Sequence, residues 1–163
     1  RPVVDDDLAN VYKGLSDPNV IQFYGVSFRS PEHTKEQMQW YADIEKDDTG
    51  RMFAICDKTN DSFMGVGGFY HWNKTHRRAE VGIWFLPDYW GKGYMEEVME
   101  AMYNLAFKEL NIHRLEGFVE TANIQCVKAL EKCGFYYEGT MRDVEFKKEQ
   151  PLNLAIYARL STD

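Results

Sequence analysis

The chain has 163 residues, of which 44% are hydrophobic and 28% charged, and a formal net charge of −7. This length allows one domain with a sizeable core and is short for two. The acidic excess argues against nonspecific binding to nucleic acid. It would favour a cationic partner, and the alternative is that it only keeps the protein in solution. No apolar run is long enough to span a bilayer or to form the core of a signal peptide, so we expect a cytoplasmic protein that makes no membrane contact.

The cysteines and histidines show no spacing typical of a metal site. Cys56, Cys126 and Cys133 contain no Cys-x-x-Cys pair, which fits a reducing compartment. The four histidines are scattered along the chain, so we expect no metal ion.

The first 50 residues are predicted to be mainly helical. Apolar residues recur at helical spacing between Leu8 and Leu15, and Asp5 to Asp7 are expected to cap this helix. Residues 20–25 are too short for an assignment. Ser30 and Pro31 begin a second helix, which ends before residues 47–50.

After residue 50 the spacing of apolar residues changes from that of helices to that of strands. Residues 51–56 and 63–70 are predicted to form a hairpin around a turn at residues 58–62. A polar loop at residues 73–78 leads into a third strand over residues 79–86. Because the connections are short, these strands are expected to be antiparallel.

A glycine loop follows this third strand. Gly91 and Gly93 flank Lys92, and apolar residues at helical spacing run from Met95 to Leu110. Glycine permits a tight turn, and the free N–H groups at a helix start can bind phosphate oxygens. A Gly-x-Gly sequence before a helix is often only a turn, so both interpretations stay open at this point.

The remaining elements complete a mixed architecture. Residues 114–120 alternate like a strand, residues 123–133 form a short helix, and Gly134 occupies the position of a left-handed cap. Two more strands are expected near residues 136–142 and 152–160. We predict a single α+β domain over residues 1–163, with a mostly antiparallel twisted sheet flanked by helices.

Three separated segments resemble one known family. Residues 79–86, 89–94 and 123–135 are similar, in order and spacing, to the GNAT superfamily of acyl-CoA-dependent N-acetyltransferases. The resemblance covers nearly the whole chain and is strongest to the branch of ribosomal-protein alanine and serine N-terminal acetyltransferases, which residues 138–143 and 157–160 also resemble. Residues 1–3 resemble the end of the family's first strand, whose beginning would be missing.

The resemblance implies acetyl-CoA as co-substrate and assigns its binding residues. The backbone N–H groups that bind the CoA pyrophosphate would be those of Gly91, Lys92, Gly93, Tyr94 and Met95. The pantetheine arm would pair with Trp84, Phe85 and Leu86, where a backbone N–H would polarise the thioester carbonyl. Asn123 would hydrogen-bond the CoA arm, and it can cap its helix at the same time.

Three residues depart from the family pattern. Asp88 stands where Gln or Arg is usual, and Glu96 replaces a small hydroxyl residue. Both acids would be unfavourable beside a pyrophosphate. Cys126 stands where the branch commonly has a serine that returns a proton to the CoA thiolate, and a thiol is a weaker hydrogen-bond donor than a hydroxyl.

Two catalytic roles remain to be assigned. Glu80 is the candidate general base, directly or through a water, and the alternative is a surface glutamate paired with Arg77 or Arg78. Cys126 is the candidate proton donor. Tyr136 or Tyr137 could supply a hydroxyl instead.

The expected function is acetyl transfer from acetyl-CoA to a primary amine, by direct attack in a ternary complex. A protein or peptide N-terminus is the favoured acceptor, and a small amine such as a polyamine or an aminoglycoside is the alternative. A noncatalytic acyl-CoA-binding module is a third possibility, raised by the three departures. A nucleotide-binding domain is disfavoured, because the chain lacks Gly-x-Gly-x-x-Gly and P-loop patterns. The oligomeric state and the acyl-chain preference stay open.

Overall fold

The computed structural model describes all 163 residues, which form two units of tertiary contacts. Unit 1 contains Arg1–Trp72 and Val81–Tyr94, and unit 2 contains Asn73–Glu80 and Met95–Asp163. Strand β3 therefore has its first residues in unit 2 and its last residues in unit 1. No helix in either unit has the length and apolar character needed to cross a membrane.

Six strands form one sheet in the order β1-β2-β3-β4-β6-β5. Their bounds are β1 Arg51–Cys56, β2 Phe63–Asn73, β3 Arg78–Phe85, β4 Arg114–Glu120, β5 Tyr136–Lys147 and β6 Gln150–Leu160. The pairs β1–β2, β4–β6 and β5–β6 are antiparallel, whereas β3 and β4 are parallel because a helical crossover connects them. The predicted α+β class and mostly antiparallel sheet are thus confirmed.

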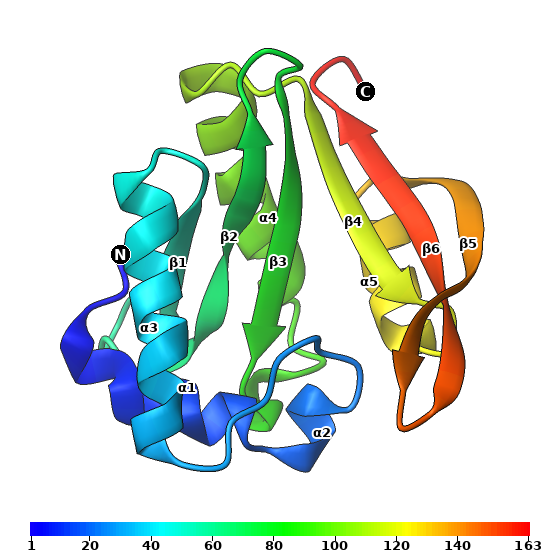
Figure 1. Cartoon of the computed structure of the whole chain (residues 1–163). Coiled ribbons are helices and arrows are strands. Elements are labelled where there is room, and N and C mark those ends of the chain that lie inside the picture. Colours follow the sequence, from blue (N-terminus) through cyan, green and yellow to red (C-terminus); the bar gives the residue numbers. More distant parts are fainter. The chain divides into compact units, whose positions relative to one another are not determined.

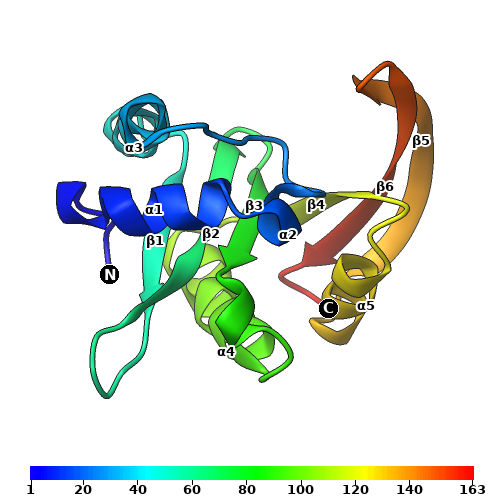
Figure 2. The same ribbon diagram turned by 90° about the horizontal axis from the view of Figure 1, so that it is seen from below.

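In unit 1, two helices cover one face of the sheet. Helix α1 (Leu8–Leu15) and helix α3 (Pro31–Lys46) pack side by side, and α3 also contacts β1 (Figures 1 and 2). Trp84 of β3 is 5% exposed and packs so closely on α1 that a side chain at Gly14 would collide with its ring. The apolar stripes predicted from helical spacing therefore form the core of unit 1.

The N-terminal turn differs from the expected capping arrangement. Residues Asp5–Asp7 form a 3-10 turn (η1), and the Asp7 side chain does not cap α1. Instead its carboxylate accepts hydrogen bonds of 2.9 Å from the Arg1 guanidinium and from the Val4 N–H. Burial alone would raise the pKa of Asp7, but these hydrogen bonds outweigh it and lower the pKa below its usual value.

The second and third helices of unit 1 begin at capped positions. The short helix α2 (Pro18–Ile21) overlaps the start of the unassigned region 20–25, and its cap Asp17 accepts a hydrogen bond from the Asn19 N–H at 2.8 Å. Ser30 caps α3 by accepting a hydrogen bond from the His33 N–H at 3.2 Å, as its sequence position predicts.

The long helix expected after the glycine loop changes its hydrogen-bond register part-way. Helix α4 (Tyr94–Tyr103) continues as a π-helix (η3, Asn104–Glu109). At its end the Leu110 N–H donates to the Leu105 carbonyl, five residues back, at 3.0 Å. The apolar spacing predicts the extent of this segment correctly, but it does not encode the change from an α-helix to a π-helix.

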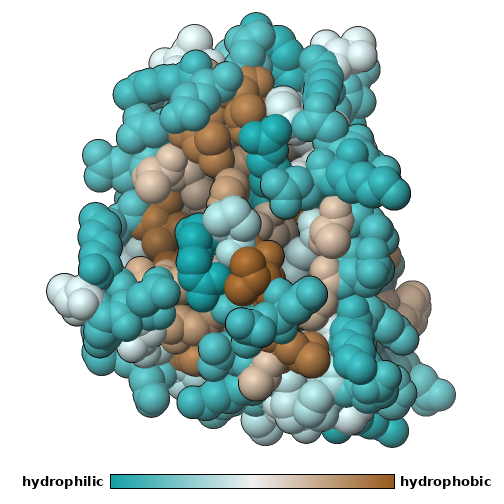
Figure 3. Space-filling view, turned by 90° about the vertical axis from the view of Figure 1, so that its left-hand side faces the viewer, coloured by the Kyte–Doolittle hydropathy of each residue, from teal (hydrophilic) through white to brown (hydrophobic).

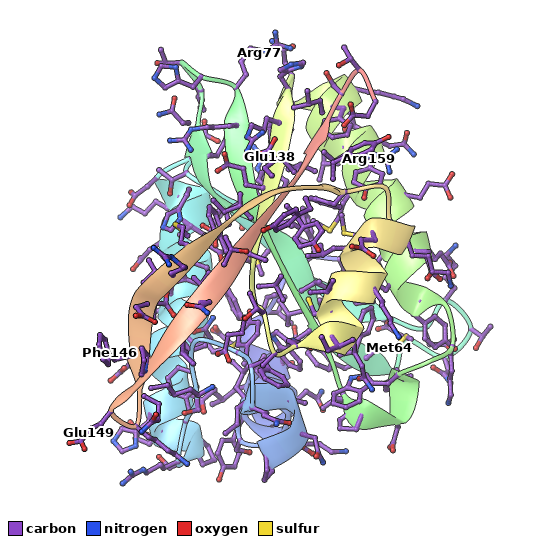
Figure 4. All side chains as sticks on the ribbon, turned by 90° about the vertical axis from the view of Figure 1, so that its right-hand side faces the viewer. Met64, Arg77, Glu138, Phe146, Glu149 and Arg159 are labelled. Atoms are coloured by element: carbon purple, nitrogen blue, oxygen red, sulfur yellow. The ribbon has the colours of Figure 1, made fainter.

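The β5–β6 hairpin of unit 2 is longer than predicted. Met141 pairs with Leu154 and Glu145 with Leu152, so three residues of β5 face Asn153 alone and form a bulge. Asp143 lies in this bulge at φ 51°, and its N–H donates to the Asn153 side chain at 2.8 Å. The polar residues near the tip hide the strand pattern. Phe146 and Glu149 lie at this tip (Figure 4), and Phe146 is 72% exposed.

Candidate cofactor and catalytic site

The end of β3 lies beyond the residues that pair with β4, which are Arg78 to Glu80. Trp84, Phe85 and Leu86 are buried, and the Leu86 N–H donates to the Met64 carbonyl of β2 at 2.8 Å. Backbone groups alternate along a strand, so the N–H and C=O of Phe85 point away from β2. Among these three residues, Phe85 therefore presents the N–H that can polarise an acyl carbonyl on that side of the strand, whereas the N–H of Leu86 is already engaged.

The glycine loop begins directly after this strand. A 3-10 turn (η2, Pro87–Tyr89) leads into it, and the Tyr89 N–H donates to the Leu86 carbonyl at 3.0 Å. Gly91 and Gly93 have φ values of 69° and 81°, a region that favours glycine. No heavy atom lies within 4 Å of a Cβ built at Gly91, so its backbone angle and not crowding requires glycine there.

A tryptophan connects this loop to the strand. The Trp90 indole N–H donates to the Phe85 carbonyl at 2.9 Å, although the Trp90 side chain is 41% exposed. Trp90 is not among the site residues predicted from the sequence. The signal in the sequence is a tryptophan directly before the glycine loop, because its indole N–H is a donor that can bind a nearby backbone carbonyl.

The start of α4 follows the loop. Tyr94 is the first residue of the helix. Its ring packs edge to face on the ring of Tyr89, with 6.2 Å between the ring centroids. The first N–H groups of a helix have no partner within it. Glu96, in the first turn, forms an ion pair with Lys132 at 2.7 Å. This partner reduces the unfavourable effect that the acid was expected to have on a phosphate.

In unit 2, helix α5 (Ile124–Lys132) brings Asn123 and Cys126 together. Asn123 caps the helix, because its Oδ1 accepts a hydrogen bond from the Cys126 N–H at 3.1 Å. The amide NH2 of Asn123 remains as a donor of two hydrogen bonds. Burial, together with the nearby Cys133, raises the pKa of the Cys126 thiol to about 11. Cys126 is therefore a protonated thiol at neutral pH.

Glu80 lies on the part of β3 that pairs with β4. It is opposite Glu116 in the parallel register. Arg78 binds Glu116 at 3.2 Å, and the Arg77 guanidinium donates to Asn111 at 2.7 and 2.9 Å. The pairing of β3 with β4 ends at Glu80, four residues before Trp84.

The predicted site residues thus fall into two groups. Unit 1 brings together the strand end Trp84–Leu86 and the loop with the helix start, 91–94, whereas Glu80, Met95, Asn123 and Cys126 belong to unit 2. A hollow of about 390 Å³ between α1 and α3 contains none of them. Its lining residues are Asp5, Leu8, Lys35, Met38, Gln39 and Ala42. Figure 3 shows the side of the molecule that bears α3, where polar side chains divide the apolar surface.

Comparison with known families identifies the chain. The acetyltransferase (GNAT) domain family matches residues 1–136. The chain belongs to the GNAT acetyltransferases. A GNAT acetyltransferase uses an acyl-CoA as the acyl donor, so this protein is an acyl-CoA-dependent N-acetyltransferase. No group of three or more His, Cys, Asp or Glu residues is placed to hold a metal ion.

The sequence of this GNAT protein is similar to those of several bacterial N-acetyltransferases. It is 26% identical to the uncharacterized N-acetyltransferase YoaA of Bacillus subtilis over 97% of this chain and 90% of that protein. It is 25% identical to the spermidine N(1)-acetyltransferase of Vibrio cholerae over 85% of this chain and 79% of that protein. It is also 24% identical to the putative ribosomal N-acetyltransferase YdaF of B. subtilis over 76% of this chain and 64% of that protein.

A solved structure has the same fold. The V. cholerae spermidine N-acetyltransferase, determined in complex with CoA and spermine, superposes with a TM-score of 0.88. The match covers 99% of this chain and 94% of that one at 23% identity. The GNAT fold expected from the sequence is therefore confirmed.

Proposed function

We propose that this GNAT enzyme acetylates a primary amine of a polyamine, with acetyl-CoA as donor. The observation that carries the proposal is the similarity to spermidine N-acetyltransferases in sequence and in fold. The net charge of −7 supports it, because an acidic protein attracts a polycation. A polyamine is the alternative acceptor predicted from the sequence, and these similarities favour it over a protein N-terminus.

The residues of the glycine loop fit a bound CoA. Its pyrophosphate would be held by the backbone N–H groups of Gly91, Lys92, Gly93, Tyr94 and Met95. The positive φ angles and the open space at Gly91 support this role. The strand end Trp84–Leu86 would pair with the arm of the cofactor, and the outward N–H of Phe85 would polarise the thioester carbonyl. The Asn123 NH2 would donate to the arm. Acetyl-CoA supplies the acyl group as an activated thioester.

Two side chains are proposed to move protons. Glu80 would accept a proton from the ammonium of the acceptor, because a protonated amine has no lone pair with which to attack. Cys126 would donate its thiol proton to the departing thiolate. Its thiol is protonated at neutral pH, but a pKa of about 11 makes it a weaker acid than an ordinary thiol. Tyr136 and Tyr137, which are 66% and 57% exposed, therefore remain alternative donors.

A protein or peptide N-terminus is the second candidate acceptor. It is supported by the resemblance to the ribosomal-protein branch and by the similarity to the putative ribosomal N-acetyltransferase YdaF. Acceptor choice varies among proteins that share one fold, so the fold alone does not separate the two candidates.

The test is an acetyl-transfer assay read by mass spectrometry. Acetyl-CoA is supplied with spermidine, spermine, an aminoglycoside, or peptides that begin with Ala, Ser or Thr. We expect one added acetyl group on spermidine or spermine, with kcat/KM at least about tenfold above that for any peptide. Transfer to peptides alone would show that the acceptor assignment is wrong. Binding of CoA without transfer to any acceptor would favour the noncatalytic module.

A further inference from the structure

We infer that Trp90 is a positioning residue that couples the two halves of the proposed CoA site. These halves are the loop 91–93 and the outer edge of β3 at Phe85. The inference rests on the proposed cofactor role of both. It starts from the hydrogen bond that the Trp90 indole N–H donates to the Phe85 carbonyl at 2.9 Å.

This hydrogen bond completes the fixation of one peptide group. On one side of the Phe85–Leu86 peptide, the N–H of Leu86 donates to Met64 at 2.8 Å. On the other side, the carbonyl of Phe85 accepts from Trp90. A peptide held on both sides cannot rotate freely, so the direction of the neighbouring Phe85 N–H is also restricted.

The loop needs an anchor of this kind. Trp90 directly precedes Gly91, and two glycines at positive φ make residues 91–93 a permissive stretch of backbone. Trp90 remains 41% exposed, so burial of its ring accounts for only part of its placement. The indole hydrogen bond fixes where the loop begins relative to the end of β3.

The consequence concerns one ligand that must reach both places. The nucleotide half of CoA carries the pyrophosphate, whereas the pantetheine half carries the amides that can pair with a strand edge. When the protein holds both sites at a fixed separation before binding, less ordering free energy is lost on association. Trp90 should therefore increase the affinity for whole CoA but not for its nucleotide half alone.

Trp90→Phe tests this inference, because it keeps a ring and removes the N–H. Affinities for CoA and for its nucleotide half, 3′-phospho-ADP, are measured by calorimetry. We expect the Kd for CoA to rise about 3- to 10-fold, as for loss of one hydrogen bond, with the Kd for the nucleotide unchanged. The same change should raise KM for acetyl-CoA more than it lowers kcat.

Trp40→Phe is the matched control, since Trp40 packs edge to face on Tyr70 at 5.4 Å within the same unit. It should leave both affinities unchanged. Urea unfolding of each variant establishes that it is folded.

Two results would overturn the inference. An unchanged CoA affinity in Trp90→Phe would show that the hydrogen bond does not matter for binding. Equal weakening of CoA and the nucleotide would show that Trp90 acts on the loop alone. If the wild-type protein binds no CoA, the proposed cofactor role itself fails, and this inference fails with it.

Discussion

The Arg159 guanidinium lies 4.1 Å from the centre of the Tyr103 ring, and both side chains donate a hydrogen bond to the Cys133 carbonyl (Figure 4 labels Arg159). Cys133 is the C-terminal cap of α5, where carbonyl groups lack partners within the helix. Gly134 follows at φ 80°, in the left-handed conformation predicted from the sequence. The two side chains thus hold the end of α5 on β6 and α4.

The raised pKa of Tyr103 leads us to expect a loss of stability in alkaline solution. Burial raises its pKa from 10.0 to about 12 in the folded protein. Between these values the unfolded chain loses its proton more readily than the folded protein, so the free energy of unfolding falls as pH rises from 10 to 12. Tyr103→Phe should make this fall shallower, measured by urea unfolding at several pH values. An identical slope in the variant would contradict the assignment.

Gly91→Ala tests the loop conformation. Alanine at a φ of 69° is strained by about 1–2 kcal/mol, although no neighbour would clash with its Cβ. If that free energy is lost from the bound loop, CoA should bind about tenfold more weakly by calorimetry. Gly25→Ala is the control, because Gly25 also has open space around its Cβ but no positive φ. Equal behaviour of the two variants would disprove a conformational role for Gly91.

The position of the glycine loop was predictable from the sequence, but the hydrogen bond that anchors it to β3 was not. The Gly-x-Gly sequence between an apolar run and a helical pattern indicates a strand, a turn and a helix start, and the asparagine at 123 indicates a cap. These are local signals. The Trp90–Phe85 hydrogen bond depends on where the loop backbone places an indole, and the sequence pattern does not encode that position.

The same distinction explains the other differences. Hydrophobic spacing identified the extent of the helix after Tyr94, whereas its π-helical end depends on hydrogen-bond register. The extension of β5 to Lys147 was hidden by polar residues, because an exposed strand needs no alternating apolar face. Asp7 was expected to cap a helix, but its buried contact with Arg1 depends on tertiary placement.

Glu80→Gln tests the proposed general base. The amide cannot accept the proton of an ammonium group, so kcat should fall roughly 10²-fold near neutral pH. A steady-state assay with the acceptor identified by mass spectrometry measures this change. Glu45→Gln, an exposed change on α3, should have no effect. Full turnover in Glu80→Gln would remove Glu80 from the mechanism.

Cys126→Ala and Cys126→Ser test the proposed proton donor as a pair. Alanine removes the proton and should lower kcat on the order of 10²-fold, whereas serine keeps a donor and should retain most of the activity. Because the pKa of the thiol is about 11, the wild-type activity should show no titration of this group between pH 7 and 9. Full activity of the alanine variant would end the proposal and favour Tyr136 or Tyr137.

The bulge in β5 has a consequence for behaviour at high concentration. β5 is the outermost strand of its sheet, and its exposed residues include Phe146 and Val144. An outermost strand that is flat and apolar is a template for strands of other molecules and a starting point for aggregation. The bend at residues 142–144 interrupts the regular row of backbone donors and acceptors, so a straight foreign strand cannot pair along the whole edge. The bulge therefore lets the chain expose apolar side chains on a long hairpin while it resists intermolecular β-sheet growth.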